Sequence, residues 1–180
     1  MRIYAIRHTS VAIDKGICYG QTDVGLAESF PEEKEKVRNR IKKVNFDAVF
    51  SSPLTRCKLL TERLFEENQI KYDDCLKEMD FGEWELWSWD AIFKDPEGKL
   101  WMDNYQTYPT KNGESYPEMA LRVSAFLNEL KFGRDEKVAI VAHAGVIRLL
   151  KHLIEGISIA ELFETFKPAY GSVTELELRL

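Results

Sequence analysis

Near its N-terminus the chain carries Ile3-Tyr4-Ala5-Ile6-Arg7-His8-Thr9, a short apolar run that stops at two basic residues. The run contains two β-branched isoleucines and predicts a buried strand. In open α/β sheets, ligands bind beyond the carboxyl ends of the strands. Arg7 and His8 are therefore predicted to lie at the edge of a ligand crevice. Considered alone, this stretch would suit a surface Arg-His pair equally well.

A second predicted strand also stops at a histidine. The strongest strand signal in the chain is Val138-Ala139-Ile140-Val141-Ala142, and His143 follows it directly. A helix is predicted after it, from about 146 to 154. Two strands that end in this way would bring their histidines to one edge of a parallel sheet.

A third strand-to-helix junction supplies an arginine. The apolar run 47–50 predicts a short buried strand, and Ser52 and Pro53 after it are the predicted N-cap and first residue of a helix. Arg56 then lies in the first helical turn, where free backbone N–H groups and the positive end of the helix dipole attract anions. An exposed helical arginine is the alternative if this junction is considered alone.

The remaining elements complete an α/β pattern. Amphipathic helices are predicted at about 31–44 and 117–131, and a weak strand at 70–76. The alternating residues 172–178 predict a half-exposed strand at the edge of the sheet. The loop from 10 to about 27 is long for a connection in a compact domain, and loops of this length are usually functional or disordered.

Aromatic residues concentrate between about 84 and 116. We interpret this segment as an insertion that packs over the sheet edge, within a single domain spanning residues 1–180. At least one of its aromatic rings could contact substrate, and the alternative is that the rings only fill a small core between the insertion and the sheet. The candidates are Trp84, Trp87, Trp89, Trp101, Tyr105 and Tyr108.

Composition favours a soluble protein of the reducing cytoplasm. The 180 residues are 44% hydrophobic and 31% charged, and no apolar run approaches the roughly 20 residues that span a bilayer. No secretory leader is predicted. Cys18, Cys57 and Cys75 have neither disulfide nor zinc-site spacing. The net charge of −5 argues against a nucleic-acid partner, so positive charge for an anionic ligand must be local.

Two histidines, two arginines and a carboxylate at one sheet edge would suit a phosphoryl group. Arginine forks match phosphate oxygens, and a neutral imidazole can attack phosphorus. His8, His143 and Glu78 are also the ligand types of a two-histidine, one-carboxylate metal site. Because the two flanking arginines would repel a divalent cation, we expect no metal.

Four segments resemble, in the same order, the motifs of the histidine phosphatase superfamily, also called the phosphoglycerate mutase-like family. Ile6-Arg7-His8-Thr9 resembles its Arg-His-Gly signature, and Ser51–Cys57 its second motif. The segment Glu78–Gly82 resembles its acid motif, and Val141–Arg148 its final His-Gly-Gly-like motif. Within the superfamily, Cys18–Val24 is similar to a stretch common in alpha-ribazole phosphatases of cobalamin synthesis.

The resemblance implies a three-layer αβα fold, with a mostly parallel central sheet and an antiparallel edge strand. It also implies that no metal or organic cofactor is needed. Roles follow by position: His8 as the nucleophile that becomes phosphohistidine, Glu78 as general acid and then base, and a phosphate pocket made of Arg7, Arg56 and His143.

Two nearby carboxylates rival Glu78 for the role of the acid. Glu83 and Glu85 lie within a few residues of it in the sequence. Glu78 is preferred because the acid of the family stands four residues before the glycine that matches Gly82.

The chain departs from the family pattern at two positions. Thr9 stands where the family has glycine, and Asp14 where it often has asparagine. Either an acid near the phosphate is tolerated, or the loop takes another path. Tyr19, Gly20 and Gln21 are the candidates to supply the missing phosphate contacts, with a purely structural loop as the alternative.

We therefore expect a cytoplasmic phosphomonoesterase that acts through phosphohistidine on alpha-ribazole 5′-phosphate in cobalamin biosynthesis. Its partner would be a small phosphate monoester, with no nucleic-acid or membrane partner, and a homodimer is left open. One alternative is a phosphatase or mutase for another small phosphate ester. The other is an inactive phosphate-binding regulatory module, which Thr9 and Asp14 make conceivable.

Overall fold

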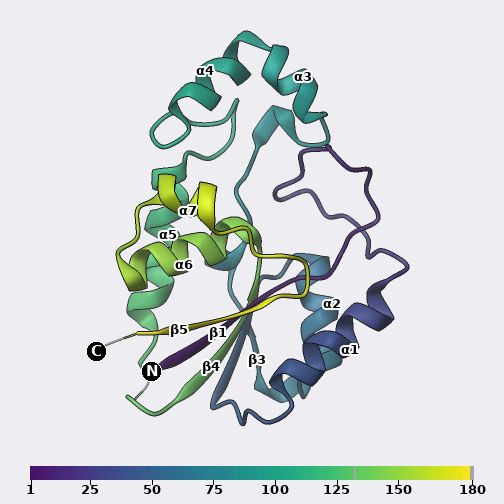
Figure 1. Cartoon of the computed structure of the whole chain (residues 1–180), viewed down its shortest axis with the longest axis vertical. Coiled ribbons are helices and arrows are strands. Elements are labelled where there is room, and N and C mark those ends of the chain that lie inside the picture. Colours follow the sequence, from purple (N-terminus) through teal and green to yellow (C-terminus); the bar gives the residue numbers. More distant parts are fainter. Residues whose placement is uncertain (132, 179–180) are drawn as a thin grey trace.

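The computed structural model describes residues 1–131 and 133–178, and these contain a five-stranded sheet between two layers of helices (Figure 1). Parallel pairing joins β1 to β4, β4 to β2 and β2 to β3, whereas β5 pairs with β1 in antiparallel fashion at the edge. The strand order is therefore β3-β2-β4-β1-β5. This confirms the predicted three-layer αβα fold. The strands are Arg2–Arg7 (β1), Ala48–Ser51 (β2), Ile70–Tyr72 (β3), Lys137–Ala142 (β4) and Val173–Glu177 (β5).

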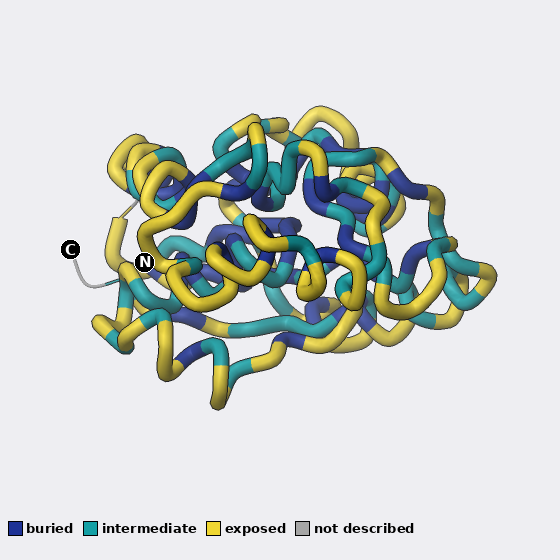
Figure 2. Tube along the Cα trace, turned by 90° about the horizontal axis from the view of Figure 1, so that it is seen from above, coloured by how far each residue is buried: buried dark blue, intermediate teal, exposed yellow. Residues whose placement is uncertain are grey.

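The central strand β4 is buried on both faces, which explains its unbroken apolar sequence. Val138 and Ile140 pack in a core cluster with residues of α5 and α6, whereas Ala139 and Val141 pack with residues of α1 and α2. Buried segments accordingly run through the middle of the molecule, and exposed residues lie on the outer turns (Figure 2). The covering helices are α1 (Phe30–Ile41), α2 (Thr55–Leu64), α5 (Tyr116–Glu129) and α6 (Ala144–Glu155).

Two predicted boundaries are wrong for local reasons. Helix α2 begins at Thr55, because Leu54, with extended backbone, occupies the N-cap position that Ser52 was expected to hold. Strand β3 ends at Tyr72, since the side chain of Asp73 accepts a hydrogen bond from the Cys75 N–H (2.8 Å) and starts a 3₁₀ turn. Arg56 nevertheless lies in the first turn of α2, as predicted.

The aromatic segment covers the carboxyl end of the sheet and not its edge. It contains α3 (Trp89–Lys94) and α4 (Pro96–Asn104), which lie beyond the ends of β1 and β4 (Figure 1). Three backbone hydrogen bonds join it to the long N-terminal loop: from Cys18 N–H to Trp87 C=O, from Leu86 N–H to Cys18 C=O and from Trp89 N–H to Gly16 C=O (2.8 Å each). The N-terminal loop and the aromatic segment therefore together cover the carboxyl ends of the strands.

One further helix, α7 (Ile159–Thr165), was not predicted. Its first turn is capped by the Ser158 side chain, which accepts from the Glu161 N–H, and it packs beside α6. No helix in residues 1–131 or 133–178 is both long and apolar enough to cross a membrane.

Candidate active site

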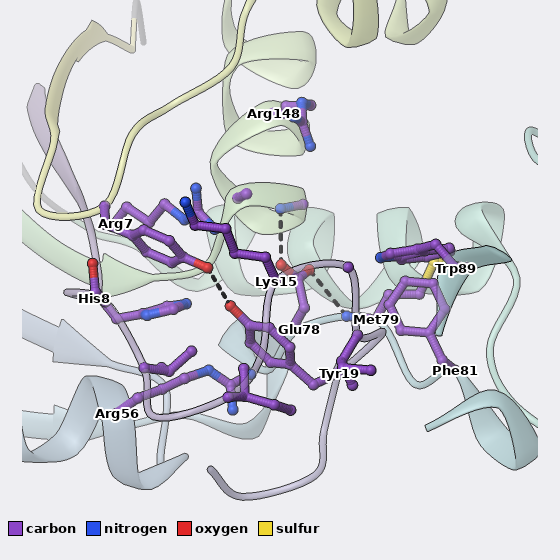
Figure 3. Close-up of a pocket in the computed structure, with 18 of the residues that line it drawn as sticks. Arg7, His8, Lys15, Tyr19, Arg56, Glu78, Met79, Phe81, Trp89 and Arg148 are labelled. Carbon is purple, nitrogen blue, oxygen red and sulfur yellow. Dashed lines mark hydrogen bonds between the residues drawn. The ribbon is translucent and has the colours of Figure 1, made fainter. Parts of the chain in front are cut away.

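Three neighbouring strands bring the predicted basic residues together at their carboxyl ends. His8 follows β1, His143 follows β4, and Arg56 lies in the helix after β2. The ring centroids of the two histidines are 5.1 Å apart, and Arg56 Nε donates to His143 Nδ1 (3.2 Å). A cavity of about 570 Å³ opens beside them, and Arg7, His8, Arg56 and Glu78 are among its lining residues (Figure 3).

His8 is held in the tautomer whose Nε2 lone pair has no hydrogen-bond donor among the described residues. Its Nδ1 lies 2.8 Å from the carbonyl oxygen of Thr9, so Nδ1 must carry the proton that it donates. Burial, followed by the charges of Arg56 and Arg7, holds the pKa of His8 well below its usual value. The imidazole is therefore neutral and has its lone pair on Nε2, as a nucleophile requires.

His143 is neutral as well, but both of its ring nitrogens already have partners. It accepts from Arg56 at Nδ1, and its Nε2 donates to Ser52 Oγ (2.8 Å). Burial, followed by the Arg56 charge, lowers its pKa well below the usual value. His143 is fully buried behind His8 and is not among the residues that line the cavity. Its direct contact with phosphate remains a prediction.

Ser52 is a site residue that the sequence analysis missed. It was expected only to cap a helix, yet its hydroxyl accepts the proton that His143 carries on Nε2, where the Arg56 donor at Nδ1 leaves it. The available signal was its position, because Ser52 directly follows β2 at the same sheet edge as His8 and His143.

Glu78 is the only one of the three candidate acids that lines the cavity. Its Oε2 accepts from the Gly145 N–H (3.1 Å) and its Oε1 from the Met79 N–H (3.1 Å). Gly145 permits this approach because a Cβ at that position would collide with Glu78 Oε1. Glu83 instead forms a surface ion pair with Lys111 (3.4 Å).

Glu85, the other rival, links the N-terminal loop to the segment Glu78–Gly82 by hydrogen bonds. Burial disfavours its charge, but hydrogen bonds from the backbone outweigh that effect and lower the pKa of Glu85 below its usual value. A carboxylate with this many partners is a structural anchor. The four N–H donors belong to Gly20, Gln21, Thr22 and Phe81.

The expected phosphate contacts from Gly20 and Gln21 are not supported by their positions. Their N–H groups donate to Glu85, and neither residue lines the cavity. The Gln21 side chain donates to the Glu78 carbonyl oxygen (3.2 Å), while the Gly20 carbonyl oxygen accepts from Arg56 (2.5 Å). Tyr19, in contrast, does line the cavity.

Of the two residues that depart from the family pattern, Asp14 lines the cavity and Thr9 does not. Thr9 is fully buried, and its side chain does not line the cavity. Asp14 does line it, so the loop brings a carboxylate into the site. Among the described residues, no group of three or more histidine, cysteine, aspartate or glutamate side chains is arranged to hold a metal ion.

Aromatic side chains line much of the cavity, and Trp89 and Phe81 lie on the side opposite His8 (Figure 3). The rings of Trp89 and Trp101 are stacked, with centroids 6.3 Å apart and planes at 19°. Three of the six predicted aromatic candidates line the cavity, namely Trp89, Trp101 and Tyr105, together with Phe81, Tyr116 and Phe163. The others do not, because Trp84 is fully buried in the core and Trp87 and Tyr108 are exposed.

Comparison with known proteins identifies the family. The sequence model described as "Histidine phosphatase superfamily (branch 1)" matches residues 3–179. The chain belongs to the histidine phosphatase superfamily.

Relatives in the superfamily carry different substrate names. A Hydrogenobacter thermophilus protein named "Putative phosphoserine phosphatase 2" is 32% identical over 184 residues, which is 98% of this chain and 89% of that protein. The alpha-ribazole phosphatase of Shigella flexneri has a TM-score of 0.87 at 23% identity, covering 100% of this chain and 95% of its own. A mycobacterial glucosyl-3-phosphoglycerate phosphatase has a TM-score of 0.83 at 22% identity, and the match covers 97% of this chain and 88% of that one. At such identities the two solved structures show a common fold and not a common substrate.

Proposed function

We propose that this member of the superfamily is a phosphomonoesterase that acts through a phosphohistidine at His8. The observation that carries the proposal is the His8 tautomer, whose free Nε2 belongs to a ring lining a cavity shared with Arg7 and Arg56. Attack of Nε2 on phosphorus would expel the alcohol, and Glu78 would protonate the leaving oxygen. The same carboxylate would then take a proton from the water that hydrolyses phosphohistidine. The two arginines would stabilise charge on the transferring oxygens.

The covalent intermediate provides the direct test. After incubation with a radiolabelled phosphate ester and quenching in base, wild type should retain an acid-labile adduct that His8→Ala lacks. His152→Ala is the matched control, because His152 Nδ1 bonds to the Ile157 carbonyl outside the cavity (2.7 Å). An adduct that persists in His8→Ala would place the nucleophile elsewhere. Absence of both adduct and p-nitrophenyl phosphate hydrolysis in wild type would favour the inactive phosphate-binding module.

For the substrate we propose alpha-ribazole 5′-phosphate, which would place the enzyme in cobalamin biosynthesis. The support is the aromatic wall formed by Trp89, Trp101 and Tyr105, on which a benzimidazole ring could stack. Stacking of a nucleobase on an aromatic side chain is worth roughly 1–3 kcal/mol. The similarity of Cys18–Val24 to alpha-ribazole phosphatases supports the same substrate.

A carboxylated phosphate ester such as phosphoserine is the second candidate, and Arg148 favours it. Arg148 lines the cavity from α6, with its guanidinium carbon 4.7 Å from the centroid of the Phe163 ring. Its Nε donates to the Phe166 carbonyl (3.1 Å), and its terminal nitrogens have no hydrogen-bond acceptor among the described residues. Burial lowers the pKa of this guanidinium, as expected of a cation without a paired carboxylate. A carboxylate on the substrate would supply the negatively charged partner that Arg148 lacks. The Hydrogenobacter relative is named for such a substrate.

Relative kcat/KM values for alpha-ribazole 5′-phosphate, ribose 5-phosphate and phosphoserine distinguish the candidates. One good stacking contact predicts a preference of about ten- to a hundredfold for the ribazole over ribose 5-phosphate. A preference below about threefold would exclude the ribazole and leave the phosphohistidine mechanism untouched. A preference for phosphoserine that Arg148→Gln abolishes would establish the second candidate.

A further inference from the structure

Two tyrosines meet at the end of the cavity where His8 lies. Tyr19 comes from the long N-terminal loop, and Tyr170 stands shortly before β5, 151 residues away in the sequence. Their hydroxyl oxygens are 2.5 Å apart, so one hydroxyl donates to the other (Figure 3). Both side chains line the cavity.

The two rings pack on the residues that we propose hold the phosphoryl group. The guanidinium carbon of Arg7 lies 4.0 Å from the centroid of the Tyr170 ring, and the His8 ring centroid lies 5.5 Å from it. The guanidinium carbon of Arg56 lies 5.3 Å from the centroid of the Tyr19 ring. The hydroxyl pair is therefore next to the place where Arg7, His8 and Arg56 meet.

The two arginines commit part of their donors to the protein. Each nitrogen of Arg56 already donates to a protein acceptor: Nε to His143, and the terminal nitrogens to the Thr22 and Gly20 carbonyls. Arg7 Nη1 donates to the Pro168 carbonyl (2.7 Å). Their other N–H groups remain available, among them Nε of Arg7, which is buried and has no hydrogen-bond partner in the described part of the chain. The three terminal oxygens of a phosphate monoester carry about six lone pairs, so they can also accept hydrogen bonds from neighbouring hydroxyl donors.

The tyrosine hydroxyls can supply these donors. Their mutual hydrogen bond uses one of the two hydroxyl protons, and the other has no acceptor in the described part of the chain. Burial, followed by the bond to Tyr170, raises the pKa of Tyr19, so this phenol keeps its proton at neutral pH. We propose that Tyr19 and Tyr170 bind the substrate phosphate, by exchanging their mutual hydrogen bond for hydrogen bonds to its terminal oxygens. This inference rests on the proposed function, which puts the phosphate between Arg7 and Arg56.

Removal of single hydroxyls tests the proposal. Tyr19→Phe and Tyr170→Phe keep the rings on the arginines and each delete one donor. Calorimetric titration with inorganic phosphate should show affinity reduced about tenfold in each variant, the usual effect of losing a hydrogen bond to a charged group. Tyr72→Phe is the matched control, because its hydroxyl bonds to Glu62 outside the cavity (3.1 Å). Its phosphate affinity should equal that of wild type.

Three results would overturn the inference: unchanged phosphate affinity in both Phe variants, tighter binding in either, or no phosphate binding by wild type. Tighter binding would mean that the hydroxyl pair obstructs the site. The titration needs no turnover, so it separates this inference from the proposed function. Wild type that binds phosphate through these hydroxyls but forms no phosphohistidine would refute the function and support the tyrosine contacts.

Discussion

Two neutral imidazoles lie side by side at the site, and their hydrogen bonds assign them different tasks. His8 uses Nδ1 to bind the Thr9 carbonyl and keeps Nε2 available. His143 uses both nitrogens, one toward Arg56 and one toward Ser52. A ring with a free lone pair can attack phosphorus, whereas a ring with both nitrogens hydrogen-bonded cannot act as a nucleophile.

Glu78 allows the sharpest prediction at the scale of single residues. Glu78→Gln should lower kcat by about 10²–10⁴-fold with a smaller change in KM, because the amide cannot protonate the leaving oxygen. The loss should be smaller for p-nitrophenyl phosphate, whose leaving group needs little protonation, than for an alkyl phosphate. Glu83→Gln is the matched control and should behave as wild type. The reverse pattern would show that the acid has been assigned to the wrong residue.

The positions of the basic residues followed from the sequence, but their hydrogen bonds did not. Arg7, His8 and His143 stand directly at strand ends, and parallel strands bring such residues to one edge whatever the loops do. The proton on Nδ1 of His8 depends on one carbonyl, and the orientation of His143 depends on Ser52. No periodicity in a sequence encodes contacts of that kind.

At the scale of elements, the N-terminal loop depends on one carboxylate. Glu85 holds the backbone from Gly20 to Thr22, and the carbonyls of Gly20 and Thr22 in turn hold Arg56. The loop therefore carries one side of the cavity, although it contains neither helix nor strand.

Glu85→Ala should loosen this loop. Backbone N–H groups that lose their acceptor cost about 1–3 kcal/mol each when they remain buried, so the free energy of unfolding in urea should fall by at least about 2 kcal/mol. Limited proteolysis should cut near residues 16–23 faster, and KM should rise. Glu83→Ala, which removes only the surface contacts with Lys111 and Asn112, should change the free energy of unfolding by less than about 1 kcal/mol. Equal effects of the two substitutions would contradict the anchoring role.

The insertion shows where prediction from sequence reaches its limit. Its aromatic content indicated a functional segment, but nothing in the spacing separated Trp84, in the core, from Trp89, in the cavity wall. That choice depends on two short helices, whose first turns are capped by Ser88 and Asp95. Such helices take their direction from tertiary packing more than from periodicity.

For the molecule as a whole, two buried histidines at one edge make stability depend on pH. Burial and the Arg56 charge hold the pKa values of His8 and His143 well below 6.5 in the folded protein, whereas in the unfolded chain they take their usual values. Below that pH the unfolded chain binds more protons than the folded one, so the free energy of unfolding falls as pH falls. Carboxylates with lowered pKa values, such as Glu85, add to the loss only below about pH 4.5.

Urea midpoints should therefore change little between pH 7.5 and about 7 and decline between about pH 6.5 and 5, before most carboxylates titrate. His143→Asn should reduce the slope of this decline, because one buried imidazole is removed. His152→Asn, at a half-exposed position outside the cavity, is the matched control for the loss of a histidine. A constant midpoint over this range would show that the two imidazoles do not couple protonation to unfolding.

The stacked rings of Trp89 and Trp101 have an optical consequence. Indole transition dipoles held this close, with Trp84 at a centroid distance of 5.7 Å from Trp101, couple to one another and absorb circularly polarised light unequally in the near ultraviolet. A planar molecule that enters the cavity against Trp89 and Trp101 would disturb this coupling and alter their emission. The enzyme therefore carries its own spectroscopic reporter of cavity occupancy, and ligands can be screened by intrinsic fluorescence without a label or a chemical reaction.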